Sequence, residues 1–133
     1  MTDIMIDTPL DGIIATNATT HPQELKTSKE ELRSVGIGAV SGPPLTERAI
    51  EVVRRVHERC NGTYPIIGVG GLMTGKDVKR MLEAGATLVQ VYTGFVYNGA
   101  GFAGELCNAI LAPEEADAAE NKEPAENSTV ENQ

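Results

Sequence analysis

The sequence is poor in the residues that build metal sites, disulfide frameworks and aromatic binding surfaces. Its 133 residues include no tryptophan, two cysteines and two histidines, and aromatic residues make up only 4%. Cys60 and Cys107 lie far apart and outside any C-x-x-C pair, so we expect reduced, packed thiols. His21 and His57 are equally isolated, and no group of His, Cys and carboxylate residues has ligand spacing. We therefore expect no metal site.

The sequence also lacks a long apolar run and a cluster of basic residues. No stretch approaches the roughly 18 consecutive apolar residues that a membrane-spanning helix needs. The N-terminus has no basic region followed by an apolar run, so no signal peptide is expected. These absences, with the unpaired cysteines, predict a cytoplasmic protein. Residues 1–112 contain twelve acids and ten bases, so the basic surface that nucleic acid requires is not expected.

Negative charge is concentrated at the C-terminal end. The formal net charge of the chain is −8 at pH 7, and residues 113–133 alone hold seven acids against one base, Lys122. That segment is rich in Glu, Asn and Ala and has no aromatic residue, which is typical of a disordered, solvated tail. Because 41% of the residues are hydrophobic, the rest of the chain can build a core. We predict one folded part over residues 1–112 and a disordered acidic tail over 113–133.

The strongest pattern is a strand–helix–strand unit over residues 65–95. Residues 65–69 are apolar without alternation, which is typical of a parallel strand covered on both faces. A helix with Val78, Met81 and Leu82 on one side follows, and Gly85 stands where a helix C-terminus favours a left-handed residue. A second apolar strand is predicted over residues 88–91.

Each of these two strands ends in a glycine-containing turn. Gly70 and Gly71 follow the first strand, and Tyr92, Thr93 and Gly94 follow the second. Backbone N–H groups can converge on an anion at such turns because no Cβ blocks the approach. In barrels of alternating strands and helices, the loops after strands seven and eight commonly bind phosphate. The pattern predicts a phosphate site, with two alternatives left open: Gly71 serves only the turn, and Tyr92 packs in the core.

The remaining segments continue the alternation of strands and helices. We expect a remnant of an amphipathic helix in residues 1–10, a buried strand over 11–17 and an extended run over 38–44. Helices are predicted over 45–60, with Thr46 as N-cap, and over 101–111, where Pro113 ends the helix. Residues 18–37, with a short helical turn near 29–33, are long for a plain connection and are predicted to form a lid or ligand loop.

This alternation predicts an α/β fold with parallel strands and right-handed crossovers. A complete (β/α)8 TIM barrel takes ~250 residues, or ~200 at the least, which is more than this chain has. The predicted fold is therefore a partial (β/α)8 barrel that comprises the last three or so strand–helix units.

Three segments together resemble the C-terminal part of a dihydroorotate dehydrogenase, most closely the class that passes electrons to quinone. They are DGIIATNATT (11–20), VSGPPLT (40–46) and PIIGVGGLMTGKDVKRMLEAGATLVQVYTGFVYNG (65–99). The resemblance implies a (β/α)8 barrel that holds FMN at the C-terminal ends of its strands and oxidises dihydroorotate to orotate in pyrimidine synthesis. It also implies a quinone acceptor and a parent enzyme that associates with membranes through an N-terminal region absent here.

The resemblance assigns roles to individual positions. Asn17 matches an asparagine that hydrogen-bonds the orotate ring, and Gly71 matches the glycine that accepts the FMN phosphate. The alternative for Thr16 and Asn17 is that they only terminate a strand. Ala18 stands where the family usually has a second threonine beside the substrate. The positions matched to cofactor binding are Thr16, Gly42, Gly70, Gly71, Tyr92, Thr93 and Gly94.

No residue of this chain matches the family's catalytic base. The matching serine and the lysine beside the flavin ring are expected upstream of Met1, so we predict that the isolated chain is inactive. An alternative in a different class is a non-catalytic half-barrel that binds a separately encoded N-terminal half or a second copy of itself through open strand edges. A third possibility is an inactive remnant that unfolds or aggregates.

Overall fold

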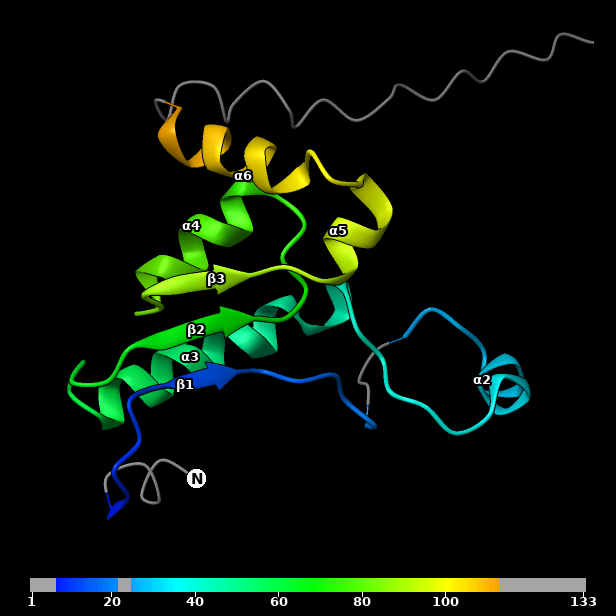
Figure 1. The fold of residues 1–133 in the computed structure, drawn as a ribbon. Helices are drawn as coiled ribbons and strands as arrows, with labels where there is room; N and C mark the ends of the chain where they lie inside the picture. The colour runs from blue at the N-terminus through cyan, green and yellow to red at the C-terminus, as the bar shows by residue number, and fades with distance from the viewer. Residues whose placement is uncertain (1–6, 22–24, 113–133) are drawn as a thin grey trace, which may run out of the picture.

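The computed structural model describes residues 7–21 and 25–112 (Figure 1). Within them, a three-stranded parallel sheet has the order β1 (Ile13–Ala15), β2 (Ile66–Val69) and β3 (Leu88–Gln90). Ile14 lies opposite Ile67, and Ile67 opposite Leu88, so these three residues form one row across the sheet. Because the strands are parallel and in chain order, their carboxyl ends meet at one edge.

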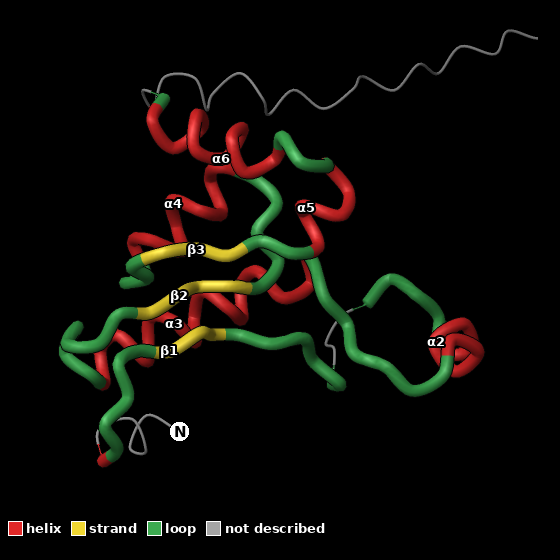
Figure 2. The backbone as a smooth tube through the Cα atoms, viewed as in Figure 1, coloured by secondary structure: helices red, strands yellow, loops and turns green. Residues whose placement is uncertain are grey.

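Helices cover one face of this sheet (Figures 1 and 2). The helix α3 (Thr46–Arg59) packs against β1 and β2, and α4 (Gly75–Glu83) packs against β3 and α3. The helix α6 (Phe102–Leu111) packs on α4, and the short α5 (Thr93–Asn98) follows β3 and contacts α6. The helix α2 (Lys29–Val35) stands apart from the sheet, within the connection that leads from β1 to α3.

The core lies between the sheet and this helical layer. Ala49, Ile50, Val53 and Val56 are buried and recur at helical spacing along α3. Ile66 of β2 is fully buried against the same layer, as are Val78 and Met81 of α4. The observed bounds confirm the predicted helices over 45–60 and 101–111 to within one residue at most at each end, and the strand over 65–69 begins one residue later.

The opposite face of the sheet is open in the described part of the chain. Ile14 is 62% exposed and Leu88 is 61% exposed. The apolar run of residues 65–69 predicted a strand covered on both faces. In β2, Ile66 is buried but Ile67 and Val69 are only partly buried, so one face of this strand is incompletely covered. Side chains alternate across a strand, so a continuous apolar run supplies two apolar faces, and the helices cover only one.

Several local predictions also differ from the structure. Thr46 is not an N-cap, because Pro43–Leu45 already forms a 3-10 turn (η1) and Leu45 precedes the first residue of α3. The extended run expected over 38–44 contains only an isolated bridge from Val40 to Thr19, and its last two residues, Pro43 and Pro44, lie in this turn. The strand expected over 11–17 is confined to residues 13–15.

Two helices extend beyond what the sequence predicted. The helix α5 was not predicted and begins within the turn expected at residues 92–94. The helix α2 continues the predicted helical turn to Val35 and begins with a Ser28–Glu31 capping box. Gly85 follows α4 with a φ of 106°, as its position predicted. The helix remnant predicted in residues 1–10 falls mostly, and the acidic tail of 113–133 entirely, outside the described residues.

Candidate functional site

A cavity of about 350 Å³ lies at the carboxyl ends of the three strands. Thr16 and Asn17 reach it from the end of β1, and Gly70 and Gly71 from the end of β2. The segment that follows β3 supplies a third side. The structure thus brings together around one cavity all eight positions that the sequence singled out, namely Thr16, Asn17, Gly42, Gly70, Gly71, Tyr92, Thr93 and Gly94.

The turn after β2 needs glycine for steric reasons. Gly70 has a φ of 132° and Gly71 a φ of 73°, both in the region that side chains disfavour. A Cβ on Gly71 would lie 2.5 Å from the Thr46 hydroxyl oxygen and 2.6 Å from the Gly42 carbonyl oxygen. Turn geometry by itself therefore requires glycine at position 71, and this alternative stays beside the phosphate role.

The segment before α3 meets the segment after β3 at this cavity. Gly42 has a φ of 86°, and a Cβ there would lie 3.0 Å from the Thr93 methyl group. The Thr93 hydroxyl donates a hydrogen bond to the Ser41 hydroxyl oxygen at 3.0 Å. Ser41 also lines the cavity and was not among the predicted residues, although it stands inside the VSGPPLT segment. The contact joins residues 52 positions apart.

The two polar residues after β1 have different surroundings. The Thr16 N–H and hydroxyl groups both donate to the Val69 carbonyl oxygen, at 2.6 and 3.3 Å, and so continue the pairing of β1 with β2. Asn17 is exposed, and its side-chain oxygen accepts a hydrogen bond from the Ala18 N–H at 2.8 Å. Its amide NH2 group remains available to a ligand.

Tyr92 does not pack in the core. It is 75% exposed at the rim of the cavity, which contradicts the core-packing alternative for this residue. Gly94 is buried instead, and a Cβ there would lie 2.4 Å from the Phe102 ring. The Gly94 carbonyl oxygen accepts a hydrogen bond from the Asn98 side chain at 2.8 Å, which anchors the start of α5.

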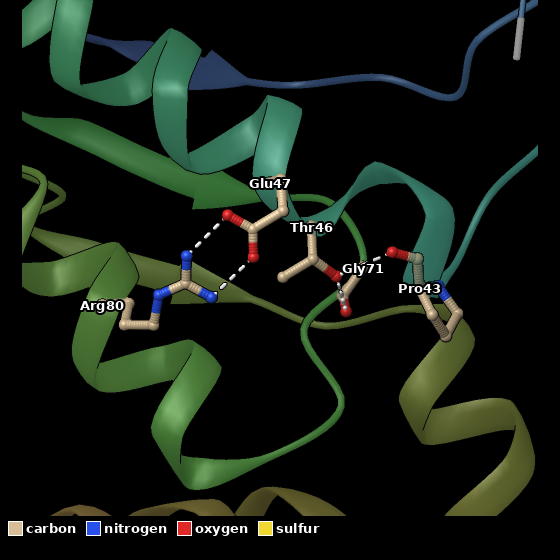
Figure 3. Close-up of polar contacts among 5 residues, drawn as sticks. All are labelled: Pro43, Thr46, Glu47, Gly71 and Arg80. Carbon is tan, nitrogen blue, oxygen red and sulfur yellow. Dashed lines mark hydrogen bonds and ion pairs between the residues drawn. The ribbon is translucent and has the colours of Figure 1, made fainter. Parts of the chain in front are cut away.

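No lysine, arginine, aspartate or glutamate of the described residues lines this cavity. An anion bound here would be held by backbone N–H and hydroxyl groups, without an ion pair. The groups whose pKa values are shifted, among them Glu47 and Arg80, lie outside the cavity. Arg80 donates two hydrogen bonds to the Glu47 carboxylate, at 2.6 and 2.7 Å, and lowers the pKa of that carboxyl below its ordinary value (Figure 3).

No group of three or more His, Cys, Asp and Glu side chains is placed to hold a metal ion in residues 7–21 and 25–112. No helix of this part of the chain combines the length and apolar character needed to cross a bilayer.

A parallel sheet covered by helices, with a cavity at its carboxyl edge, defines the class of structure, a part of a barrel of alternating strands and helices. The family model of dihydroorotate dehydrogenase matches residues 1–112, and the chain belongs to this family. It is 34% identical to ligand-free DHODH from Eimeria tenella, with a TM-score of 0.74 over 83% of this chain and 30% of that one. This match confirms the predicted partial (β/α)8 barrel.

The curated relatives carry the same family name. A dihydroorotate dehydrogenase (quinone) from Corynebacterium efficiens is 45% identical over 97 residues, which are 73% of this chain and 26% of the relative. The enzyme of that name from Thermosynechococcus vestitus is 49% identical over 107 residues, which are 77% of this chain and 29% of the relative. The chain thus spans less than a third of the length of these relatives, which agrees with the expected partial barrel.

Proposed function

We propose that this chain is the part of an FMN-dependent dihydroorotate dehydrogenase that holds the flavin phosphate. One observation supports this most directly: the turns at residues 70–71 and 92–94 line a single cavity at the carboxyl edge of the sheet. Had these turns faced different sides of the molecule, the proposal would have failed. Family membership supplies the cofactor class, and the cavity supplies a place that suits its phosphate.

The residues present suit a phosphate group. No described backbone carbonyl accepts a hydrogen bond from the Gly71 or Leu72 N–H group, so both donors are available at the cavity wall. The Thr93 hydroxyl adds a donor that can turn from Ser41 to a ligand oxygen. The proposed cofactor contacts are Thr16, Gly42, Gly70, Gly71, Tyr92, Thr93 and Gly94.

Asn17 is the proposed substrate contact. Its exposed amide lies on the same cavity wall, and an amide can both donate to and accept from a ring that carries C=O and N–H groups. Bound FMN would supply the two-electron acceptor for the oxidation of dihydroorotate, and a quinone would be its reoxidant in the whole enzyme. The membrane association of that enzyme and a cytoplasmic location for this chain remain predictions.

The proposal is tested by comparing FMN with riboflavin, which lacks the phosphate. Quenching of flavin fluorescence should show that the purified chain binds FMN at least about tenfold more tightly, because only FMN engages the turn amides. Gly71→Ala should remove this preference. Gly36→Ala is the matched control, since Gly36 also has a positive φ of 88° but nothing within 4 Å of its added methyl. Equal affinity of the wild-type chain for both flavins would refute the phosphate site.

A phosphate site does not by itself make the isolated chain an active enzyme. The chain has no residue matched to the catalytic base, and a general base typically contributes about 10² to 10⁴ in rate. We therefore expect the purified chain to oxidise no dihydroorotate above a control that contains free flavin alone. Turnover above that control, followed as orotate formation, would contradict this expectation.

A second candidate function, a half-barrel assembly module, is favoured by the open face of the sheet. The row formed by Ile14, Ile67 and Leu88 presents apolar side chains there, and within the described residues β1 and β3 each have only one strand neighbour. The interior of a complete barrel is filled by layers of such side chains from alternate strands. The proposed occupant is the remaining set of strand–helix units of the same family, supplied by a separate polypeptide.

Co-expression with the N-terminal portion of a quinone-type relative tests this module. A yellow complex that copurifies is expected, and Leu88→Lys should abolish it by placing a charge in the barrel interior. Leu111→Lys is the matched control, because Leu111 is 83% exposed on α6, away from the sheet. Failure of the two polypeptides to copurify would exclude assembly in trans, and sedimentation of the chain alone would reveal self-association instead.

A further inference from the structure

We propose that Thr46 is a positioning residue for the phosphate of the flavin nucleotide. Its hydroxyl holds the peptide between Gly71 and Leu72 in the orientation that presents the Leu72 N–H group to the cavity. This inference rests on the proposed function and deepens it, since neither the sequence pattern nor the resemblance assigns Thr46 a role in binding.

Thr46 is unusual in its burial. It is 9% exposed and is the only buried polar or charged residue of the described part of the chain. A buried hydroxyl without a partner is unfavourable, so its hydrogen bonds determine how the surrounding segments sit. The Thr46 oxygen lies 3.0 Å from the Pro43 carbonyl oxygen and 2.6 Å from the Gly71 carbonyl oxygen (Figure 3).

The single hydroxyl proton goes to Gly71. The Pro43 carbonyl oxygen already accepts the Thr46 backbone N–H group, whereas no described backbone N–H group donates to the Gly71 carbonyl oxygen. The shorter of the two distances also belongs to the Gly71 contact. The Thr46 hydroxyl is thus the hydrogen-bond donor that satisfies this carbonyl, from a position 25 residues away in the chain.

This contact orients the next N–H group. A trans peptide is planar, so its C=O and N–H bonds point in opposite directions. With the Gly71 carbonyl turned toward Thr46 and α3, the Leu72 N–H group points away from that helix. Gly71 and Leu72 both line the cavity, and no described backbone carbonyl accepts this N–H group.

The contact leaves little freedom for the turn. A Cβ on Gly71 would lie 2.5 Å from the Thr46 hydroxyl oxygen and 2.7 Å from its backbone nitrogen, so Thr46 and Gly71 are in tight contact. Without the hydroxyl, the Gly71 peptide loses its fixed partner and can rotate. An amide that must be reoriented before it binds phosphate binds more weakly, since part of the interaction energy is used for ordering.

The test uses two variants of Thr46 and two flavins. Thr46→Val keeps the shape and removes the hydroxyl, and Thr46→Ser keeps the hydroxyl and removes the methyl group. We expect Thr46→Val to bind FMN about tenfold more weakly with unchanged riboflavin affinity, and Thr46→Ser to bind FMN within about twofold of wild type. Thr63→Val, at an exposed threonine ahead of β2, is the matched control and should change neither affinity.

The outcomes separate the two proposals. If the wild-type chain prefers FMN and Thr46→Val keeps that preference, the role of Thr46 is refuted and the phosphate site stands. If the wild-type chain binds both flavins equally, the phosphate site fails and the role of Thr46 fails with it.

A measurement on the wild-type chain covers the case in which Thr46→Val does not fold. FMN should shift the NMR amide resonance of Leu72 and riboflavin should not, because only the phosphate reaches this N–H group. An equal response of Leu72 to both flavins would overturn the proposal.

Discussion

The two faces of the same short sheet have opposite surroundings. On the helical side, Ile66 of β2 is fully buried beneath α3 and α4. On the other side, Ile14 of the neighbouring β1 is 62% exposed although it has the same side chain. Strand pairing and backbone geometry are shared, so what differs between these isoleucines is whether a second layer covers them.

The difference shows where the stability of the described part resides. Burial of apolar surface contributes about 25 cal/mol per Å², so a side chain that stays in water contributes little. The helical side alone forms the core, and the open side retains its apolar surface for a partner. Three predictions test this division, in order of decreasing expected effect.

The largest change in stability is expected when the buried Ile66 is truncated, and almost none when the exposed Ile14 is truncated. Ile66→Ala should lower the free energy of unfolding by about 3 kcal/mol, because it removes fully buried methyl groups and leaves a cavity. Ile14→Ala should change it by less than about 0.5 kcal/mol, as for other exposed sites. Urea denaturation of the purified chain measures both values. Equal losses would mean that the open face is covered in solution, which a concentration-dependent midpoint would attribute to self-association.

Smaller changes in stability are expected within the helical layer, where replacing Gly75 by alanine should destabilise the fold and replacing Gly104 should stabilise it. Gly75→Ala places a Cβ 2.4 Å from that of Ala109, where α4 meets α6, and should be destabilising by about 1–3 kcal/mol. Gly104 lies in α6 with nothing within 4 Å, so Gly104→Ala should be stabilising by about 0.5 kcal/mol through helix propensity. Thermal melts followed by circular dichroism would compare them. A stable Gly75→Ala variant would show that α6 is not closely packed on α4.

The smallest effect is expected from the ion pair that links α3 to α4. The hydrogen bond from Arg80 lowers the pKa of Glu47 in the folded chain, so the stabilisation is complete above the ordinary pKa of this carboxyl, 4.5. It is lost as the pH falls through the lower pKa of the folded state. Both side chains are partly exposed, 77% for Glu47 and 37% for Arg80, so the contribution is small.

A double-mutant cycle with Glu47→Gln and Arg80→Gln isolates this ion pair. The coupling measured from urea midpoints should be present near pH 7 and diminish as the pH falls below 4.5. A coupling that is independent of pH would show that the Glu47 charge does not stabilise the fold.

Local sequence patterns predicted most of the secondary structure. The spacing of Ala49, Val53 and Val56 indicated α3, and the apolar runs indicated β2 and β3. The helix α5 was missed because residues 92–94 resemble a turn and the exposed residues Phe95, Val96 and Tyr97 show no helical period. The role of Thr46 was misread because the 3-10 turn before it makes Leu45 the residue that precedes the helix.

The candidate site, like the secondary structure, was predictable from the sequence only in part. Glycine at positions 70, 71 and 94 was readable as a turn signal, and the resemblance pointed to the polar residues beside them. The contact of Thr46 with Gly71 and that of Thr93 with Ser41 were not predictable, because each joins segments at least 25 positions apart. Such contacts depend on how α3 and the strand ends are docked, and no local pattern encodes that arrangement.

Short-range information in the chain specifies the helices, the strands and the glycine turns, because backbone sterics and hydrophobic periodicity act over a few residues. Packing over long range places three distant segments around one cavity and determines which face of the sheet is covered. An apolar run records only that a strand can be buried on both sides. Which side is buried depends on the layers that the rest of the fold brings against it.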